Sequence, residues 1–259
     1  MQPRSIALPG RRSTLVYRTG SGPPLVWLHG LYGVEPDGPV IERLASRYDV
    51  IAPLAPGFAD LDELDDLRDI HDLALHYDDI LEALGLSSVS LAGHSFGAMI
   101  AAEIAAHVPM RVAKLVLLSP LGLWNDSYPV ADLWGIPPEE APRLLYAKPP
   151  PVQEAPATPD VETVMARARG MASVARFLWP VPDRGLVRRL HRVRAPTLVV
   201  HGALDAFVPV QYASEFVTRL PDAKLRIIDG AGHMLPVEAG ETVAEALLDF
   251  LPARLEVGV

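Results

Sequence analysis

Short, continuous runs of apolar residues recur along this chain and constrain its fold more than any other feature. A run without polar alternation is typical of a strand that is buried on both faces, as in a parallel sheet. Segments with helical periodicity separate these runs, as at Ile70–Leu84. The alternation predicts an α/β fold with a mostly parallel, twisted sheet and helices on both faces. The runs that we interpret as strands are Pro24–Leu28, Tyr48–Ala52, Val89–Ala92, Leu115–Leu118, Thr197–Val200 and Leu225–Ile228.

The regular alternation stops after Gly122 and returns near residue 193. Eight of the 26 prolines lie between Pro137 and Pro159. Proline has no N–H to donate and a fixed φ, so a sheet cannot continue through this stretch. Helical patterns follow the prolines. We therefore predict a split core of residues 1–122 and 193–259, with a largely helical cap or lid inserted at residues 123–192.

The segment from Val89 to His107 carries the strongest catalytic signal. An apolar run leads into Gly93-His94-Ser95-Phe96-Gly97, and an apolar helical pattern follows. A sharp turn from strand to helix lifts a serine hydroxyl out of the sheet, and flanking glycines remove Cβ atoms that would clash. The N-terminus of the helix favours developing negative charge. This setting predicts that Ser95 is a nucleophile. The alternative is a glycine-rich turn in which the serine has no catalytic role.

A serine hydroxyl needs a base, and the best placed of the eight histidines is His233. It follows the run at Leu225–Ile228 in a glycine-flanked loop, which predicts a place at the carboxyl edge of the sheet. Asp205 follows another strand and is our candidate for the acid that orients the base; Asp126 is the second candidate. Four other histidines lie in helical or cap segments, where we expect them at the surface: His71, His76, His107 and His191.

A tetrahedral intermediate also needs two N–H groups directed at its oxygen. The N–H of Phe96, directly after the candidate nucleophile, is one expected donor. The N–H of Leu31, in the loop that follows the strand at Pro24–Leu28, is the other. His29 in the same loop is expected to shape the loop without taking part in the chemistry.

Short motifs, in the order and with the spacing of a known protein superfamily, extend over nearly the whole predicted core. They are His29-Gly30, Pro56-Gly57-Phe58, Gly93-His94-Ser95-Phe96-Gly97, Pro196–Gly202, Asp205 with Val208-Pro209, and Gly232-His233 with Glu238. With these motifs the sequence resembles the α/β-hydrolase superfamily, and the order serine, aspartate, histidine is the order of that fold. The resemblance implies a serine hydrolase with Ser95, Asp205 and His233 as its catalytic residues.

Differences from known branches of the superfamily limit the reactions that this chain can be expected to catalyse. Epoxide hydrolases and haloalkane dehalogenases of this fold attack with aspartate, and here the position is Ser95. Carbon–carbon bond hydrolases often carry asparagine before the nucleophile and tryptophan soon after the histidine, where this chain has His94 and Met234. Arg176 or Arg188 in the cap remain candidates for binding an acidic substrate. The sequence thus favours hydrolysis of a carboxylic ester, with a carbon–carbon bond hydrolase or a lactonase as the alternatives.

We expect a small, largely apolar substrate, an acyl-enzyme on Ser95 and no metal or organic cofactor. A small-molecule receptor or binding protein without activity is the alternative of another class. Apolar walls for the substrate are expected from cap side chains that are equally suited to packing against the core. These candidates are Trp124, Trp134, Phe177, Leu178 and Trp179.

Composition restricts partners and location. The formal net charge of −9 argues against a nucleic-acid partner, because phosphate binding needs a basic surface. The chain has no cysteine, so disulfides, thiol catalysis and thiolate metal sites are excluded. No apolar run approaches the roughly 20 residues of a membrane helix, and no signal peptide is evident. We therefore expect no membrane insertion and a cytoplasmic protein.

Overall fold

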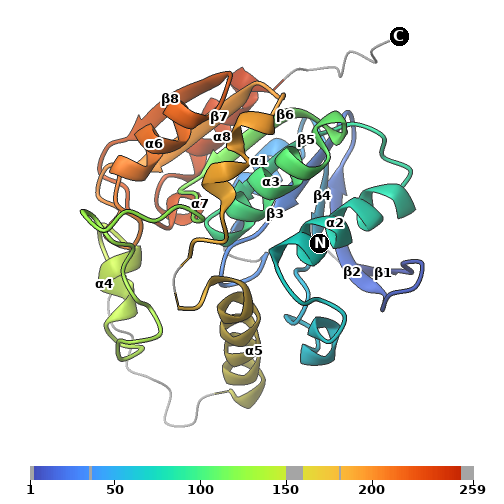
Figure 1. Cartoon of the computed structure of the whole chain (residues 1–259), viewed down its shortest axis with the longest axis horizontal. Helices are drawn as coiled ribbons and strands as arrows, with labels where there is room; N and C mark the ends of the chain where they lie inside the picture. Colours follow the sequence, from blue (N-terminus) through green and yellow to red (C-terminus); the bar gives the residue numbers. More distant parts are fainter. Residues whose placement is uncertain (1–2, 35–36, 150–159, 181, 252–259) are drawn as a thin grey trace.

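The computed structural model describes the chain apart from residues 1–2, 35–36, 150–159, 181 and 252–259. An eight-stranded sheet with the order β1-β2-β4-β3-β5-β6-β7-β8 forms its centre (Figure 1). Only β2 runs antiparallel to its neighbours within the described sheet, and all other pairs are parallel. The strands are β1 (Pro3–Ile6), β2 (Thr14–Gly20), β3 (Pro24–Leu28), β4 (Asp49–Pro53), β5 (Val89–His94), β6 (Val112–Leu118), β7 (Thr197–Gly202) and β8 (Ala223–Ile228).

Helices cover both faces of the sheet. Alternate residues of a central strand point to opposite sides, and where both sets are apolar, each face needs a cover. Leu115 and Leu117 of β6 join an apolar cluster with α2, α3 and α6, while Val116 and Leu118 join a second cluster with α1, α7 and α8. The predicted α/β fold is thereby confirmed. The helices are α1 (Gly38–Leu44), α2 (Ile70–Ala83), α3 (Phe96–His107), α4 (Ala141–Leu145), α5 (Val161–Leu178), α6 (Gln211–Arg219), α7 (Leu235–Glu238) and α8 (Gly240–Phe250).

Residues 123–192 are called the cap segment here; its helices α4 and α5 lie apart from the sheet (Figure 1), whereas its last turn packs on α3. Three side chains of α5 donate hydrogen bonds to loops of the core, and the first of them is Arg169, which donates to the carbonyl of Phe58 at 3.3 Å. The Ser173 hydroxyl donates to the carbonyl of Pro56 at 2.6 Å, and the Arg176 guanidinium donates to the carbonyl of Leu67 at 2.8 and 2.9 Å. The segment ends in two 3-10 turns, η4 (Leu186–Arg188) and η5 (Leu190–Arg192), where sequence periodicity predicted a helix.

Two expectations about exposure need correction. His76 is buried, because it lies on the inner side of α2, next to Tyr77. The apolar run in β8 forms an edge strand, in which Leu225 and Ile227 stay exposed. A strand with a neighbour on one side only lacks the cover that central strands receive.

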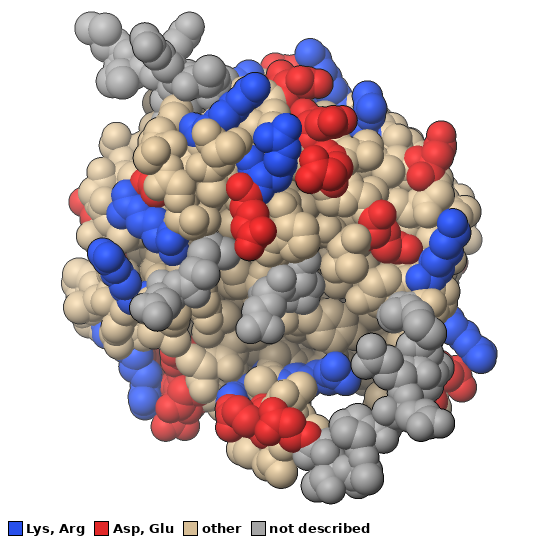
Figure 2. All heavy atoms as spheres, turned by 180° about the vertical axis from the view of Figure 1, so that it is seen from behind, with Lys and Arg blue, Asp and Glu red and all other residues tan. Residues whose placement is uncertain are grey.

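None of the helices in the described part of the chain is long and apolar enough to cross a bilayer. On the face shown in Figure 2, acidic and basic side chains alternate. Such mixing is typical of a solvated surface and differs from the basic stripe of a nucleic-acid-binding protein.

Candidate active site

Ser95 lies in the sharp turn between β5, which ends at His94, and α3, which begins at Phe96. Its φ of 57° is in the left-handed region that non-glycine residues seldom adopt. Gly97 lets the turn approach β3, because a Cβ there would come closer than 3.0 Å to the carbonyl oxygen of Leu28. Backbone strain of this kind is typical of functional sites, and here it holds the hydroxyl at the carboxyl edge of the sheet.

The loops after β7 and β8 bring Asp205 and His233 to Ser95. The Ser95 hydroxyl lies 2.7 Å from Nε2 of His233, and Nδ1 of the same ring lies 2.8 Å from Oδ2 of Asp205. The geometry suits a hydroxyl that donates to the imidazole and an imidazole that donates to the carboxylate. All three side chains are buried. The structure thus brings together the three residues that the sequence singled out from three separate strand ends.

Asp205 is held as a carboxylate. Its Oδ1 accepts hydrogen bonds from the N–H groups of Phe207 and Val208, at 3.0 and 2.8 Å. Burial alone would raise its pKa, but His233 and His201 outweigh burial and hold the pKa well below its usual range. The acid therefore carries a negative charge at every pH at which the histidine can act as a base.

His233 is held as a neutral imidazole. Burial lowers its pKa, and Asp205 opposes that shift without cancelling it. A histidine that is neutral at physiological pH has a free electron pair on Nε2, and this is the atom that faces the Ser95 hydroxyl. The arrangement can accept a proton from the serine as the hydroxyl oxygen forms a new bond.

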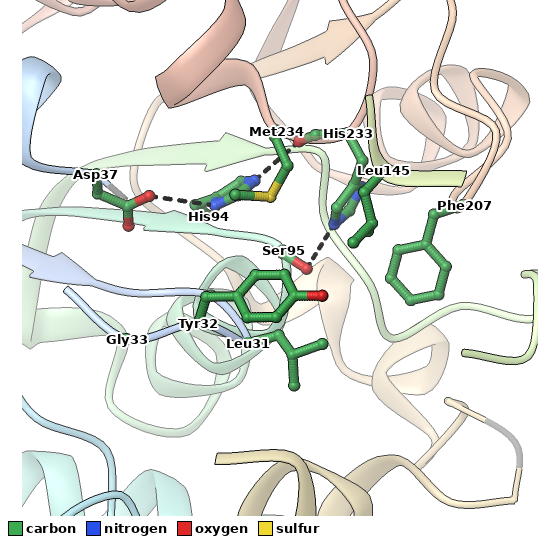
Figure 3. Close-up of a pocket in the computed structure, with 11 residues that line it drawn as sticks. Leu31, Tyr32, Gly33, Asp37, His94, Ser95, Leu145, Phe207, His233 and Met234 are labelled. Atoms are coloured by element: carbon green, nitrogen blue, oxygen red, sulfur yellow. Dashed lines mark hydrogen bonds and ion pairs between the residues drawn. The ribbon is translucent and has the colours of Figure 1, made fainter. Parts of the chain in front are cut away.

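Of the two expected oxyanion donors, Leu31 borders a small opening at Ser95, and Phe96 follows Ser95 directly in the chain. Phe96 is the first residue of α3, so its N–H has no acceptor in the preceding turn of helix. Leu31 lies in the loop after β3, beside Ser95 (Figure 3). Among the residues that the structure describes, neither N–H donates to a protein acceptor. Both are available for an oxygen of a bound substrate.

Two residues weighed from the sequence occupy other roles. His29 accepts from the Ala55 N–H at 2.9 Å through Nε2, and its Nδ1 lies 2.7 Å from the carbonyl oxygen of Gly30, so it ties two loops together. Asp126 accepts a hydrogen bond from the indole of Trp124 at 2.8 Å. The carboxylate that contacts His233 is Asp205.

A cavity of about 670 Å³ lies next to the small opening at Ser95 and shares wall residues with it. Leu31, Tyr32, Leu145 and Met234 border both this cavity and the small opening above the serine (Figure 3). Its far wall comes from the cap segment, with α4 and the first turns of α5. Cap residues on this wall are Pro138, Ala141, Pro142, Tyr146, Glu162, Thr163, Ala166 and Arg167.

The cap side chains that we expected to line the substrate do not border this cavity. Trp124, Trp134 and Leu178 border a separate hollow of about 60 Å³, which shares the wall residue Phe207 with the opening above Ser95. Phe177 is buried and stacks on Phe96, with ring centroids 6.2 Å apart, and Trp179 is 46% exposed. None of the five borders the 670 Å³ cavity.

Among the cavity residues that the sequence did not single out are Tyr32, Leu145, Tyr146 and Arg167. Burial raises the pKa of both tyrosines, and the charge of Arg167 opposes the rise at both, so the guanidinium lies near the two rings. Among the described residues, Arg167 forms no ion pair. Its place on α5 gave no sequence signal, because a charged residue on an amphipathic helix usually faces water.

The described residues offer no cluster of three or more histidine, aspartate or glutamate side chains suited to a metal ion.

Comparison with known proteins gives one family and several relatives. Residues 25–246 match the model of the "Alpha/beta hydrolase family". A 2-hydroxymuconate semialdehyde hydrolase of Pseudomonas sp. (strain CF600) is 29% identical, over 96% of this chain and 93% of that protein.

Two solved structures show the same fold. A meta-cleavage product hydrolase from Pseudomonas fluorescens IP01 has a TM-score of 0.77 at 22% identity, over 95% of this chain and 96% of that one. Naproxen esterase (carboxylesterase NP) from Bacillus subtilis has a TM-score of 0.74 at 21% identity, over 96% of this chain and 90% of that one. The two similar structures carry different activities in their names, so the fold alone does not select a reaction.

Proposed function

This chain belongs to the alpha/beta hydrolase family, and on that premise we propose that it is a serine hydrolase that cleaves a carboxylic ester of a small, largely apolar substrate. The observation that carries the proposal is the chain of hydrogen bonds from Ser95 through His233 to Asp205, at 2.7 and 2.8 Å. Ser95, at one end of these hydrogen bonds, borders an opening next to a cavity that is large enough for a small molecule.

The proposed reaction has two steps. The Ser95 oxygen attacks the ester carbonyl while its proton passes to Nε2 of His233, and the negative oxygen accepts from the N–H groups of Leu31 and Phe96. The bond to the alcohol breaks, and the proton on His233 passes to the leaving oxygen. Water then attacks the acyl-enzyme, with His233 as its base, and the acid is released. Asp205 stabilises the imidazolium in both steps.

A carbon–carbon bond hydrolase is the second candidate, and Arg167 favours it. Hydrolysis of a ring-fission product acts on a substrate with a carboxylate, and Arg167, which has no ion pair among the described residues, borders the cavity. Arg176 is engaged with the carbonyl of Leu67, and Arg188 is exposed on η4, so neither borders the cavity. The relative from Pseudomonas sp. (strain CF600) is named for such a reaction. A lactonase would use the same three residues.

The test compares wild type with Ser95→Ala on a chain-length series of p-nitrophenyl esters and on a 2-hydroxy-6-oxo-dienoate. Ester turnover that disappears in Ser95→Ala would support the leading proposal. Turnover of the dienoate alone would favour the carbon–carbon hydrolase. A folded wild type that turns over neither, and whose Ser95 is not labelled by a fluorophosphonate probe, would contradict both and favour a binding protein.

A further inference from the structure

A second pair of acid and imidazole lies beside Ser95 and is not needed for the reaction described above. Asp37 and His94 are both buried, with exposed fractions of 1% and 2%. We propose that Asp37 and His94 are positioning residues, which hold the loop of His233 in place and put a positive charge beside its imidazole. The catalytic consequence rests on the proposed function of Ser95 and His233, whereas the contacts themselves do not.

His94 connects the two loops that the reaction uses. It is the last residue of β5, directly before Ser95, and its Nε2 donates to the backbone carbonyl of His233 at 2.9 Å (Figure 3). Its ring also packs on the loop after β3, where a Cβ on Gly30 would come within 3.1 Å of Nδ1. Leu31, one of the two expected oxyanion donors, follows Gly30. One side chain thus contacts both the loop of the base and the oxyanion loop.

Asp37 anchors this arrangement from the other side. Its Oδ1 lies 3.4 Å from Nδ1 of His94, and its Oδ2 accepts a hydrogen bond from the indole of Trp27 at 2.8 Å. Trp27 is buried inside β3. The carboxylate is therefore fixed to the sheet, and it presents its free oxygen to His94.

The hydrogen bonds indicate the protonation state of His94. A backbone carbonyl only accepts, so Nε2 carries a proton. In the neutral ring, the electron pair on Nδ1 would then face the Asp37 carboxylate in a buried place, which is unfavourable. Burial opposes a charge on His94, but Asp37, the His233 carbonyl and Asp205 outweigh it, and the pKa of His94 is raised. Both ring nitrogens of His94 thus face acceptor oxygens, and this geometry supports the positive charge that we propose.

A cation at this place acts on the base of the reaction. The rings of His94 and His233 have centroids 5.4 Å apart, and the charge of His94 contributes to the lowered pKa of His233. The effect keeps His233 unprotonated, and so able to accept a proton, at lower pH than it would otherwise be. The ionisable groups that face this pair of rings are Asp37, His29, Asp205 and His201.

Two substitutions at position 94 separate the charge from the hydrogen bond. His94→Gln keeps an N–H that reaches the His233 carbonyl but carries no charge. His94→Asn places its amide near the position of Nδ1, so it can face Asp37 but does not reach His233. Asp37→Asn removes the countercharge. His76→Gln, a buried histidine on α2, is the matched control and is expected to change neither activity nor the pKa of His233.

The primary measurement is an NMR titration of the histidine Cε1–H signals, which needs no substrate. In His94→Gln the pKa of His233 should rise by about one unit, as expected for removal of a cation at this distance. In Asp37→Asn the pKa of His94 should fall, because Asp37 is the strongest of the groups that oppose the effect of burial. A wild-type His94 that titrates at or below its ordinary value, or a His233 pKa unchanged in His94→Gln, would overturn the proposal.

The second measurement is the pH profile of ester hydrolysis. The acidic limb of kcat/KM should move to higher pH in His94→Gln by the same amount as the NMR shift. His94→Asn should lower kcat about tenfold with KM nearly unchanged, because the loop of His233 loses its anchor. An unchanged kcat in His94→Asn would overturn the anchoring role. If wild type turns over no ester while the NMR shifts occur, the proposed ester hydrolysis is contradicted, but the proposed charge of His94 beside His233 is supported.

Discussion

The site is bounded by two walls that are built in different ways: the core wall carries Ser95, Asp205 and His233, and the cap wall borders the cavity next to them. On the core side, the reactive side chains are buried, and hydrogen bonds join Ser95 to His233 and His233 to Asp205 across three separate loops. On the cap side, the first two turns of α5 are exposed, and Arg167 there has no ion pair among the described residues. The core wall positions reacting atoms, whereas the cap wall presents side chains that a substrate can contact.

The same contrast appears within α5. Its C-terminal half is held by Ser173 and Arg176, and Val174 and Phe177 are buried. Its N-terminal half, with Arg167, borders the cavity. A helix fixed at one end and open at the other can vary the shape of a site without disturbing the chemistry, since few contacts of the core depend on its free end.

The largest expected effect tests whether the core wall carries the chemistry. Asp205→Asn should lower kcat by about 10⁴-fold, because the amide cannot stabilise the imidazolium and favours the wrong tautomer of His233. Steady-state ester hydrolysis measures the effect. Asp126→Asn, at the second candidate acid, is the control and should keep wild-type kcat. Equal losses of kcat in both variants would contradict the assignment of Asp205 as the acid that orients His233.

The next effect tests how tightly the core wall is packed. In Gly97→Ala the new Cβ would approach the carbonyl oxygen of Leu28 closer than 3.0 Å, and backbone on both sides resists movement. Urea unfolding should show a loss of roughly 3 kcal/mol or more in the free energy of unfolding. In the cap segment, Gly135→Ala meets only the flexible side chain of Asp132 and should cost less than about 1 kcal/mol. Similar losses would contradict the contrast between the two walls.

The smallest effect tests whether the cap wall selects the substrate. Arg167→Gln should raise KM for an ester that carries a carboxylate roughly tenfold, the scale of one charge-assisted hydrogen bond, and leave KM for an uncharged ester unchanged. Arg188→Gln, on the exposed turn η4, is the matched control. Equal changes for both esters would show that Arg167 shapes the wall without recognising a charge.

Much of the fold was predictable, because its signals are local. Continuous apolar runs marked the strands, and glycines around Ser95 marked the elbow, since only a residue without Cβ fits there. The predicted helix at Ile70–Leu84 corresponds to α2, where the Asp69 side chain caps the first turn. The short helices α4 and α7 were missed, because each spans too few residues for a periodic pattern.

The cap was less predictable for a physical reason. Trp134 and Phe177 are apolar in the same way whether they contact a substrate, the core or each other, and their sequence neighbours do not distinguish these cases. The buried pair Asp37 and His94 was also missed, because an aspartate before a helix and a histidine in an elbow motif each have an ordinary local explanation.

The sequence by itself determined the fold class and the places of Ser95, Asp205 and His233 at strand ends, because backbone propensity and strand burial are encoded within a few residues of each position. Only the tertiary structure decided which side chains share a space: Arg167 with the cavity, and Asp37 with His94. The reason is that these contacts join segments far apart in the chain, and they depend on how the loops at the carboxyl edge of the sheet pack against one another.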